Sequence, residues 1–500
     1  MSVRSIILRG GNVCDGSGAD PVPGEVLIEN GRIAAVEAPG TFEKSDAEVV
    51  DCAGKIVAPG FIDAHSHGDF RKLKFPDNRS KLLQGVTTEV DGNCGESASC
   101  GARRTGDLRW SGLPEYLKLL EESPASTNTV VLCGHNTIRR AVMGQSDAPA
   151  GADEIKAMRR KLEAAFACGA AGWSSGLTYL PGKFSDTAEM TALSEVTRGT
   201  EKIYATHMRS EGDRLLEAVD EACRIARAGS GRVQISHLKT ICRRNFHKID
   251  GLLETLENER RSELFLHADR YPYVETSTYI RQALPPPYGR EPGIAAKLRA
   301  SAALRDEVAA ALRDCPRDLP TTVVLREGLD FSAIAARDGV SVERAAMKLI
   351  MENPGEFVAY RCMSPENLRR ILLAPWVCAG SDGVSMQLDD PAETGHPRAV
   401  GTFPRFFRMV SGALGTGEAV RRMTHLPARI FRIPERGLVK RGFVADLVVF
   451  DAEKFDSGAG FCGEPAAPAG MERVFVAGKE AWSAAKPEHV GRFGRYLPID

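Results

Sequence analysis

The stretch Gly60-Phe61-Ile62-Asp63-Ala64-His65-Ser66-His67 decides the fold, because an apolar run of strand length ends in two histidines one residue apart. Side chains alternate along a β-strand with a period of two, so His65 and His67 point to the same side and can converge on one ion. The alternative is a pair of ordinary loop or core histidines. Further ligands elsewhere in the chain would favour the metal site.

The composition is that of an ordinary globular protein. The chain has 500 residues, 43% of them hydrophobic, which is enough for one large core with satellites. A formal net charge of -1 gives no global attraction to nucleic acid or to an anionic membrane. There is no signal-length apolar core near the N-terminus and no apolar run of about 18 residues, so we expect a cytoplasmic protein. The 12 scattered cysteines, without a Cys-x-x-Cys pair, indicate reduced thiols.

A repeating unit fills the centre of the chain: a short apolar strand, a polar residue at its C-terminal end, and an amphipathic or turn-rich return. Eight such strands are predicted, at residues 61–65, 87–91, 129–133, 171–175, 203–207, 233–237, 265–269 and 376–380. The helical periodicity of returns such as 155–166 and 215–226 supports this pattern. The fold class is therefore α/β, and the architecture a (β/α)₈ TIM barrel whose chemistry lies at the C-terminal ends of its strands.

Both chain ends are rich in short β-branched runs, and Asn30-Gly31 between two of them indicates a hairpin. Neither end has enough strands for a stable sheet alone, so we expect residues 1–58 and 430–485 to combine into one small β-sandwich. The barrel would then span 59–429, with a helical insertion at 285–355 after strand seven. Residues 486–500 would form a C-terminal tail.

Zinc-ligand residue types stand at the ends of the predicted strands. They are His65, His67, Cys94, His207, His237 and Asp382. Imidazole and thiolate suit Zn²⁺, and a catalytic zinc site keeps one position open for water. Each residue alone could be structural, but together on successive strands of one barrel they predict a metal site.

The motifs around these residues extend over nearly the whole chain. They include Pro59-Gly60-Phe61-Ile62-Asp63-Ala64-His65-Ser66-His67, Gly92-Asn93-Cys94-Gly95, Gly134-His135-Asn136-Thr137, Thr206-His207-Met208-Arg209-Ser210-Glu211, Gln234-Ile235-Ser236-His237-Leu238-Lys239, Tyr271-Pro272-Tyr273, Gly380-Ser381-Asp382-Gly383 and His396-Pro397-Arg398. The sequence resembles the metal-dependent amidohydrolase superfamily and, within it, the D-aminoacylase (N-acyl-D-amino-acid deacylase) family. The position of Cys94 is the most specific point of this resemblance.

The resemblance implies zinc-dependent hydrolysis of the amide bond of a small-molecule substrate, an N-acyl-D-amino acid, to a carboxylate and a free D-amino acid. By the same resemblance, Cys94, His207 and His237 hold the catalytic zinc, while His65 and His67 line a second, weaker metal position that shares Cys94. Asp382 is then the general base. The family's binders of the substrate carboxylate map onto Lys239, Tyr271 and Ser277. The D-configuration rests on the resemblance alone, and no spacing encodes the oligomeric state.

Two departures from the family pattern lie in the segment from Lys239 to Phe246, where Cys242 replaces a glycine and Phe246 a tryptophan. This segment borders the site, so acyl or side-chain preference can differ from that of typical members. Arg281 and Arg290, after strand seven, would suit an acidic side chain of the substrate or stand exposed in solvent.

Two other functions stay open. A cyclic amidase, similar to hydantoinases and dihydroorotases, would place a carbamylated lysine on strand four, but this strand ends in Trp173-Ser174-Ser175. A non-catalytic scaffold protein with this fold would have lost metal ligands, and none is lost here.

Overall fold

The computed structural model describes residues 5–42, 47–285, 287–291, 293–388, 390, 393, 395–461 and 466–500. At its centre lies a parallel sheet of eight strands in the order β6-β7-β10-β11-β12-β13-β14-β19. Their bounds are β6 (Phe61–Asp63), β7 (Val86–Asp91), β10 (Asn128–Gly134), β11 (Gly172–Gly176), β12 (Ile203–His207), β13 (Arg232–Ile235), β14 (Phe265–Arg270) and β19 (Val377–Ala379). All eight overlap the predicted strands.

The first and last strands meet and nearly close the barrel. The Ala64 amide donates to the Ala379 carbonyl at 3.3 Å, and beyond the strand ends the Asp382 amide donates to the His65 carbonyl at 2.8 Å. The predicted fold class is thus confirmed. The closure also brings His65 and Asp382, which are far apart in sequence, next to each other.

Helices surround the sheet and bury its outer face. They are α1 (Asp69–Lys74), α2 (Arg79–Leu82), α3 (Leu113–Glu122), α4 (His135–Met143), α5 (Ala152–Ala167), α6 (Thr187–Ser194), α7 (Leu215–Ala228), α8 (Ile249–Arg261), α13 (Pro365–Leu373), α14 (Arg398–Leu414), α15 (Thr416–Met423) and α16 (His425–Ile430). A hairpin of β8 (Cys100–Thr105) and β9 (Leu108–Gly112) precedes α3. Inside the barrel Val130, Leu132 and Ala205 share a core with Leu497 and Ile499 of the C-terminal tail.

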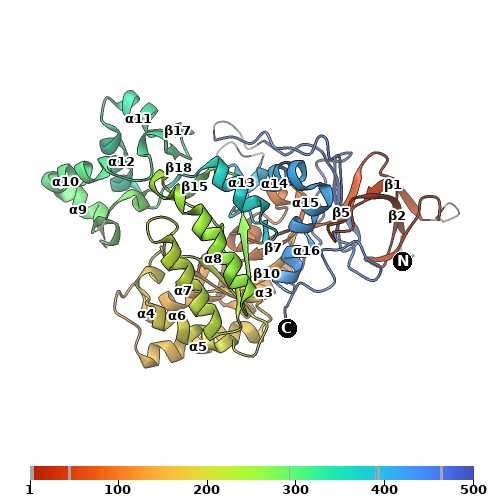
Figure 1. Ribbon diagram of the computed structural model, residues 1–500, viewed down its shortest axis with the longest axis horizontal. Coiled ribbons are helices and arrows are strands. Elements are labelled where there is room, and N and C mark those ends of the chain that lie inside the picture. The colour runs from red at the N-terminus through yellow and green to blue at the C-terminus, as the bar shows by residue number, and fades with distance from the viewer. Residues whose placement is uncertain are drawn as a thin grey trace.

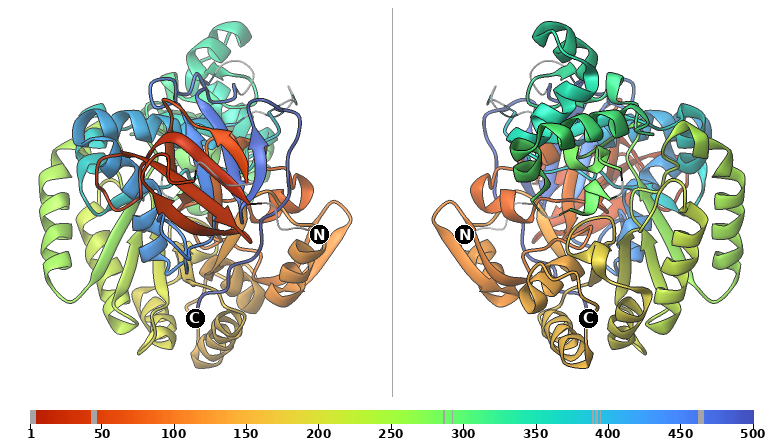
Figure 2. Two further views of the ribbon diagram at one scale, coloured as in Figure 1. Left: turned by 90° about the vertical axis from the view of Figure 1, so that its right-hand side faces the viewer. Right: turned by 90° about the vertical axis from the view of Figure 1, so that its left-hand side faces the viewer.

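The two chain ends combine in one mixed sheet beside the barrel. Its strands are β1 (Ile6–Val13), β2 (Val22–Glu29), β3 (Arg32–Glu37), β4 (Glu48–Asp51), β5 (Ile56–Pro59), β20 (Leu447–Phe450), β21 (Met471–Val476) and β22 (Lys479–Ser483). The left view of Figure 2 shows the red N-terminal strands beside the blue C-terminal strands. Asn30 and Gly31 have φ values of 52° and 77° and turn the predicted hairpin between β2 and β3. The domain boundaries drawn from the sequence stay a prediction.

The long segment between β14 and β19 lies on the opposite side of the barrel from this sheet (Figure 1). Its helices are α9 (Ile294–Ala300), α10 (Ala302–Arg313), α11 (Phe331–Asp338) and α12 (Val342–Glu352). It also holds a four-stranded antiparallel sheet of β15 (Glu275–Tyr279), β16 (Val323–Val324), β17 (Leu329–Asp330) and β18 (Phe357–Arg361). This sheet was not predicted, because β16 and β17 are too short to show alternation and β15 and β18 pair across some 80 residues of sequence.

In the part of the chain that the structure describes, no helix is long and apolar enough to cross a membrane.

Candidate metal centre

The six predicted ligand and base residues lie at the C-terminal ends of the barrel strands. His207 is the last residue of β12, and the others follow β6, β7, β13 and β19 within a few residues. Their ligand atoms form two groups that share Cys94, and within each group the atoms lie within 4.8 Å of one another. One group contains His65, His67, Cys94 and Asp382, and the other contains Cys94, His207 and His237. Barrel closure therefore brings together residues that span more than 300 positions of sequence.

Cys94 lies at the centre of the cluster. Its Sγ is 3.4 Å from His65 Nε2, 3.7 Å from His207 Nδ1 and 3.5 Å from His237 Nε2. Zinc–sulfur and zinc–nitrogen bonds at a tetrahedral angle separate the two donor atoms by about 3.5 Å. The donor set and its spacing therefore fit a zinc ion, with Cys94, His207 and His237 as the residues that would hold it.

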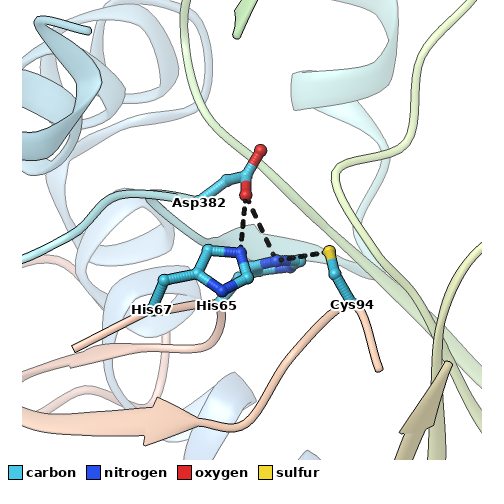
Figure 3. Close-up of side chains that lie close together, drawn as sticks. All are labelled: His65, His67, Cys94 and Asp382. Atoms are coloured by element: carbon cyan, nitrogen blue, oxygen red, sulfur yellow. Dashed lines mark hydrogen bonds and ion pairs between the residues drawn. The ribbon is translucent and has the colours of Figure 1, made fainter. Parts of the chain in front are cut away.

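Asp382 presents its two carboxylate oxygens to different partners. Oδ1 lies 3.1 Å from His67 Nε2 and 3.4 Å from His65 Nε2, as Figure 3 shows. Oδ2 lies 2.9 Å from Nη1 of Arg398. Burial raises the pKa of Asp382, but Arg398 and the imidazoles hold it well below its usual range. The carboxylate is thus ionised, with one oxygen aimed at the metal position.

Three of these residues have a positive φ, a backbone conformation that residues other than glycine rarely adopt. The φ values of Cys94, His237 and Asp382 are 51°, 37° and 49°. The backbone segments around Cys94 are tightly packed, because a Cβ atom added to Gly176 would lie only 2.1 Å from the Cys94 carbonyl oxygen. Such strain is held only where the surrounding structure enforces it, and it gathers at functional sites.

Three of the four histidines have a polar contact at a second ring nitrogen. His65 Nδ1 lies 3.2 Å from Asp269 Oδ1, and His237 Nδ1 lies 3.0 Å from Glu211 Oε1. His207 Nε2 lies 3.2 Å from the Thr178 hydroxyl. Such contacts orient an imidazole for metal binding. The sequence analysis had assigned no role to Glu211 or Asp269, although both stand near predicted strand ends.

The groups of the cluster shift one another's pKa values. Burial raises the pKa of Cys94, but His65, His207 and His237 hold it well below the usual range of a thiol, so Cys94 is a thiolate. Burial lowers the pKa of His67, yet Asp382 and Cys94 raise it to about 9. A metal ion would displace such protons when it binds.

The predicted carboxylate-binding residues lie close to this cluster. The Lys239 ammonium contacts Glu211 and lies 2.7 Å from His237 Nδ1. The buried Tyr271 hydroxyl has no hydrogen-bond partner among the described residues, and the Arg270 guanidinium lies 4.1 Å from its ring centroid. Burial raises the pKa of Tyr271, but Lys239, Arg270 and Arg398 lower it below its usual value. A hydroxyl donor without a partner, surrounded by cations, is suited to a carboxylate.

Ser277 on β15 lines a cavity of about 600 Å³ together with His67, Cys94 and Asp382. Cys242, with a φ of 68°, lines a different cavity of about 990 Å³ that also contacts His207. The carbonyl oxygen of Phe246 accepts a hydrogen bond from Asn367 Nδ2 at 2.8 Å. Of the two departures from the family pattern, Cys242 thus lines the second cavity.

Known proteins similar to this chain share its full length. A model described as "Amidohydrolase family" matches residues 48–179. An N-acyl-D-aspartate deacylase of Alcaligenes xylosoxydans xylosoxydans is 32% identical over 496 residues, covering 96% of this chain and 92% of that protein.

Two solved structures agree with this. An N-acyl-D-glutamate deacylase from Bordetella bronchiseptica, complexed with zinc and a phosphonate inhibitor, is 30% identical with a TM-score of 0.84 and 100% of both chains covered. A D-aminoacylase studied for its binuclear metal center is 32% identical with a TM-score of 0.82, covering 98% of this chain and 99% of that one. The chain therefore belongs to the D-aminoacylase (N-acyl-D-amino-acid deacylase) family and is a metal-dependent amide hydrolase of the amidohydrolase superfamily.

Proposed function

We propose that this enzyme uses zinc to hydrolyse the amide bond of N-acyl-D-amino acids, releasing a carboxylate and a free D-amino acid. The observation that carries the proposal is the approach of three imidazole nitrogens to Cys94 Sγ at 3.4–3.7 Å, beside the ionised Asp382. The D-configuration and the use of zinc are supported by the names of similar proteins, which are deacylases of N-acyl-D-amino acids, one of them complexed with zinc.

Zinc at Cys94, His207 and His237 would polarise the amide carbonyl and lower the pKa of a water molecule. Asp382 Oδ1, which lies beside His65 and His67 in the cluster, would take one proton from the attacking water. As the carbon–nitrogen bond breaks, Asp382 passes this proton to the departing amine. The water oxygen stays on the acyl carbon with its second proton, which the new carboxylic acid releases to solvent or to the amine, so the products are a carboxylate and an amine.

Lys239, Tyr271 and Ser277 would hold the substrate carboxylate. The Tyr271 hydroxyl, which has no partner among the described residues, and the nearby cations can donate hydrogen bonds to a carboxylate. Ser277 lines the same cavity as Asp382. The substrate is therefore anchored by its carboxylate while its acyl carbonyl lies at the metal position.

One tightly bound zinc and a second, weaker position are proposed. The group of His65, His67, Cys94 and Asp382 shares only Cys94 with the group that would hold the first ion. Two ions that share the Cys94 thiolate repel each other, so the second ion should bind more weakly than the first. The similar D-aminoacylase with a binuclear metal center supports two positions.

The proposal is tested with the zinc-reconstituted enzyme on matched N-acetyl-D- and N-acetyl-L-amino acids, with metal content measured in parallel. We expect turnover of the D-series, little of the L-series, and at least one zinc per chain.

Ring opening of 5-substituted hydantoins, in place of hydrolysis of N-acyl-D-amino acids, would indicate a cyclic amidase. In the structure β11 carries no lysine, and its Ser175 hydroxyl lies 2.7 Å from the Tyr204 hydroxyl. A folded, metal-free and inactive protein would indicate a scaffold.

A further inference from the structure

The cavity in front of the metal cluster has two walls. The barrel supplies His67, Cys94 and Asp382, while the segment after β14 supplies Ser277 and the residues that follow it. Among these is Arg281 in the 3₁₀ turn Ile280–Ala283, which directly follows β15. The proposed binder of the substrate carboxylate and this arginine thus stand on the same wall, four residues apart.

Arg281 differs from other cations of the cavity in having no partner. Its Nη2 is buried, and its guanidinium makes no hydrogen bond or ion pair within the residues that the structure describes. Arg140, in the same cavity, pairs with Glu96, and Arg398 pairs with Asp382. A buried guanidinium nitrogen that loses water without gaining an acceptor is costly, and an anionic ligand would remove that cost.

Building on the proposed function, we propose that Arg281 binds a second carboxylate of the substrate, so that the enzyme selects N-acyl derivatives of acidic D-amino acids. The first carboxylate is held at Ser277, and the acyl carbonyl must reach the metal position. The side chain of the amino acid is then the group left to contact the wall beyond Ser277. A guanidinium binds a carboxylate through two charge-assisted hydrogen bonds. It binds the isosteric amide, which carries no charge, more weakly.

The similar proteins do not decide this point, because an N-acyl-D-aspartate deacylase, an N-acyl-D-glutamate deacylase and a D-aminoacylase are 30–32% identical to this chain. The cavity also contains Tyr179, Tyr279 and Phe357, whose rings would suit an apolar side chain. The unpartnered charge of Arg281 favours the acidic substrate. The side chain of Arg290, the other arginine considered from the sequence, lies outside what the structure describes.

The test compares N-acetyl-D-glutamate with its isostere N-acetyl-D-glutamine and with N-acetyl-D-methionine, using the zinc-loaded enzyme. We expect kcat/KM for the glutamate derivative to exceed that for the other two at least tenfold. Arg281→Met should lower kcat/KM for the glutamate derivative by about 10- to 100-fold, the worth of hydrogen bonds to a charged group. The ratio between acid and amide should then approach one, and Arg281→Lys should restore part of it.

Arg313→Met is the matched control, since Arg313 is an exposed residue at the end of α10, and it should leave the ratio unchanged. Equal turnover of the three substrates, with no effect of Arg281→Met on their ratio, would overturn the role of Arg281 and leave the proposed function intact. If no N-acyl-D-amino acid is hydrolysed, the proposed function is wrong. Calorimetric binding of D-glutamate against D-glutamine to wild type and Arg281→Met then decides on Arg281 separately.

Discussion

Cys94, His237 and Asp382 show how individual residues are set for chemistry. All three have positive φ values, which cost roughly 1–3 kcal/mol each in a non-glycine residue. Each stands in a short connection just beyond a barrel strand, where the backbone must turn sharply to bring its side chain into the cluster. The backbone at these three residues is thus less stable locally, and in return the thiolate, the imidazole and the carboxylate are placed in the cluster.

Asp382→Asn tests the general base. The amide keeps the shape of the side chain but cannot take a proton, so kcat should fall by about 10²–10⁴. Zinc content should stay at the wild-type value, because Asp382 is not one of the three residues proposed to hold the tight zinc. Steady-state kinetics and metal analysis check both points. Asp306→Asn, at an exposed position, is the control and should behave as wild type. Turnover near normal in Asp382→Asn would refute the assignment.

Individual residue roles were predictable only in part. The residue types that bind zinc are few, and their places after apolar strands are visible in the sequence, so a cluster of these side chains could be predicted, and the structure brings them together. The pairing of Arg398 with Asp382 was not predicted, although Arg398 stands in a motif that was noticed. An arginine carries no sequence signal for its partner, because the partner is chosen by the approach of two separate segments.

At the scale of elements, the seam between the first and last barrel strands is held by a fully buried lysine. Lys81, on α2, donates from Nζ to Asp63 Oδ2 at 2.7 Å and to the Ser381 hydroxyl at 2.6 Å. A further hydrogen bond, at 3.3 Å, reaches the carbonyl of Gly383. Lys81 therefore ties the strand that leads to His65 to the two residues that flank Asp382.

Lys81→Met should lower the free energy of unfolding by about 3–5 kcal/mol, because it leaves buried carboxylates without their cation. Activity should fall as well, since the seam positions both sides of the site. Urea unfolding monitored by circular dichroism, with kinetics below the transition, measures the two effects. Lys118→Met, which removes an exposed pair with Glu122, should change stability by less than about 0.5 kcal/mol. An unfolding midpoint equal to that of wild type in Lys81→Met would contradict this role.

His267 on β14 gives the fold a dependence on pH. Burial lowers its pKa to about 2, and the nearby Arg260 and Arg429 act in the same direction. In the unfolded chain the pKa is about 6.5, so the stabilising effect of neutral His267 is complete above that pH and is lost as the pH falls towards 2. Its contribution to the free energy of unfolding should fall by up to about 1.4 kcal/mol per pH unit in this window.

His267→Gln cannot take up this proton, so its free energy of unfolding should vary less between pH 6.5 and about 4 than that of wild type. Urea unfolding at several pH values measures the difference in slope. His247→Gln, at an exposed position, serves as the control and should keep the wild-type slope. Equal slopes for wild type and His267→Gln would show that His267 titrates normally.

On the scale of the whole molecule, the barrel lies between the terminal sheet on one side and the segment after β14 on the other (Figure 1). Only the latter borders the cavity in front of the metal cluster, through residues such as Ser277 and Phe357. Substrate preference is therefore expected to depend on this segment. The terminal sheet packs on the barrel, and none of its described residues lines this cavity.

Zinc should stabilise the whole fold, because its proposed ligands come from three different strand ends. At a free zinc concentration 100 times Kd, binding to the folded state alone adds about 2.7 kcal/mol to the free energy of unfolding. Removal of zinc by a chelator should therefore lower the thermal midpoint, and added zinc should restore it. In Cys94→Ala the midpoint should no longer respond to zinc. An equal response in this variant would argue against Cys94 as a ligand.

Local patterns in the sequence were enough to predict the eight strands, the pairing of the two chain ends and the residue types at the candidate metal centre. These follow from periodicity, turn residues and ligand chemistry, which act within a few neighbouring positions. Other features appear only in the folded chain: Arg398 faces Asp382, Lys81 holds the seam, Arg281 has no partner among the described residues, and β15–β18 form a sheet. These features depend on contacts between segments that are distant in the chain, and such contacts leave no local pattern to recognise.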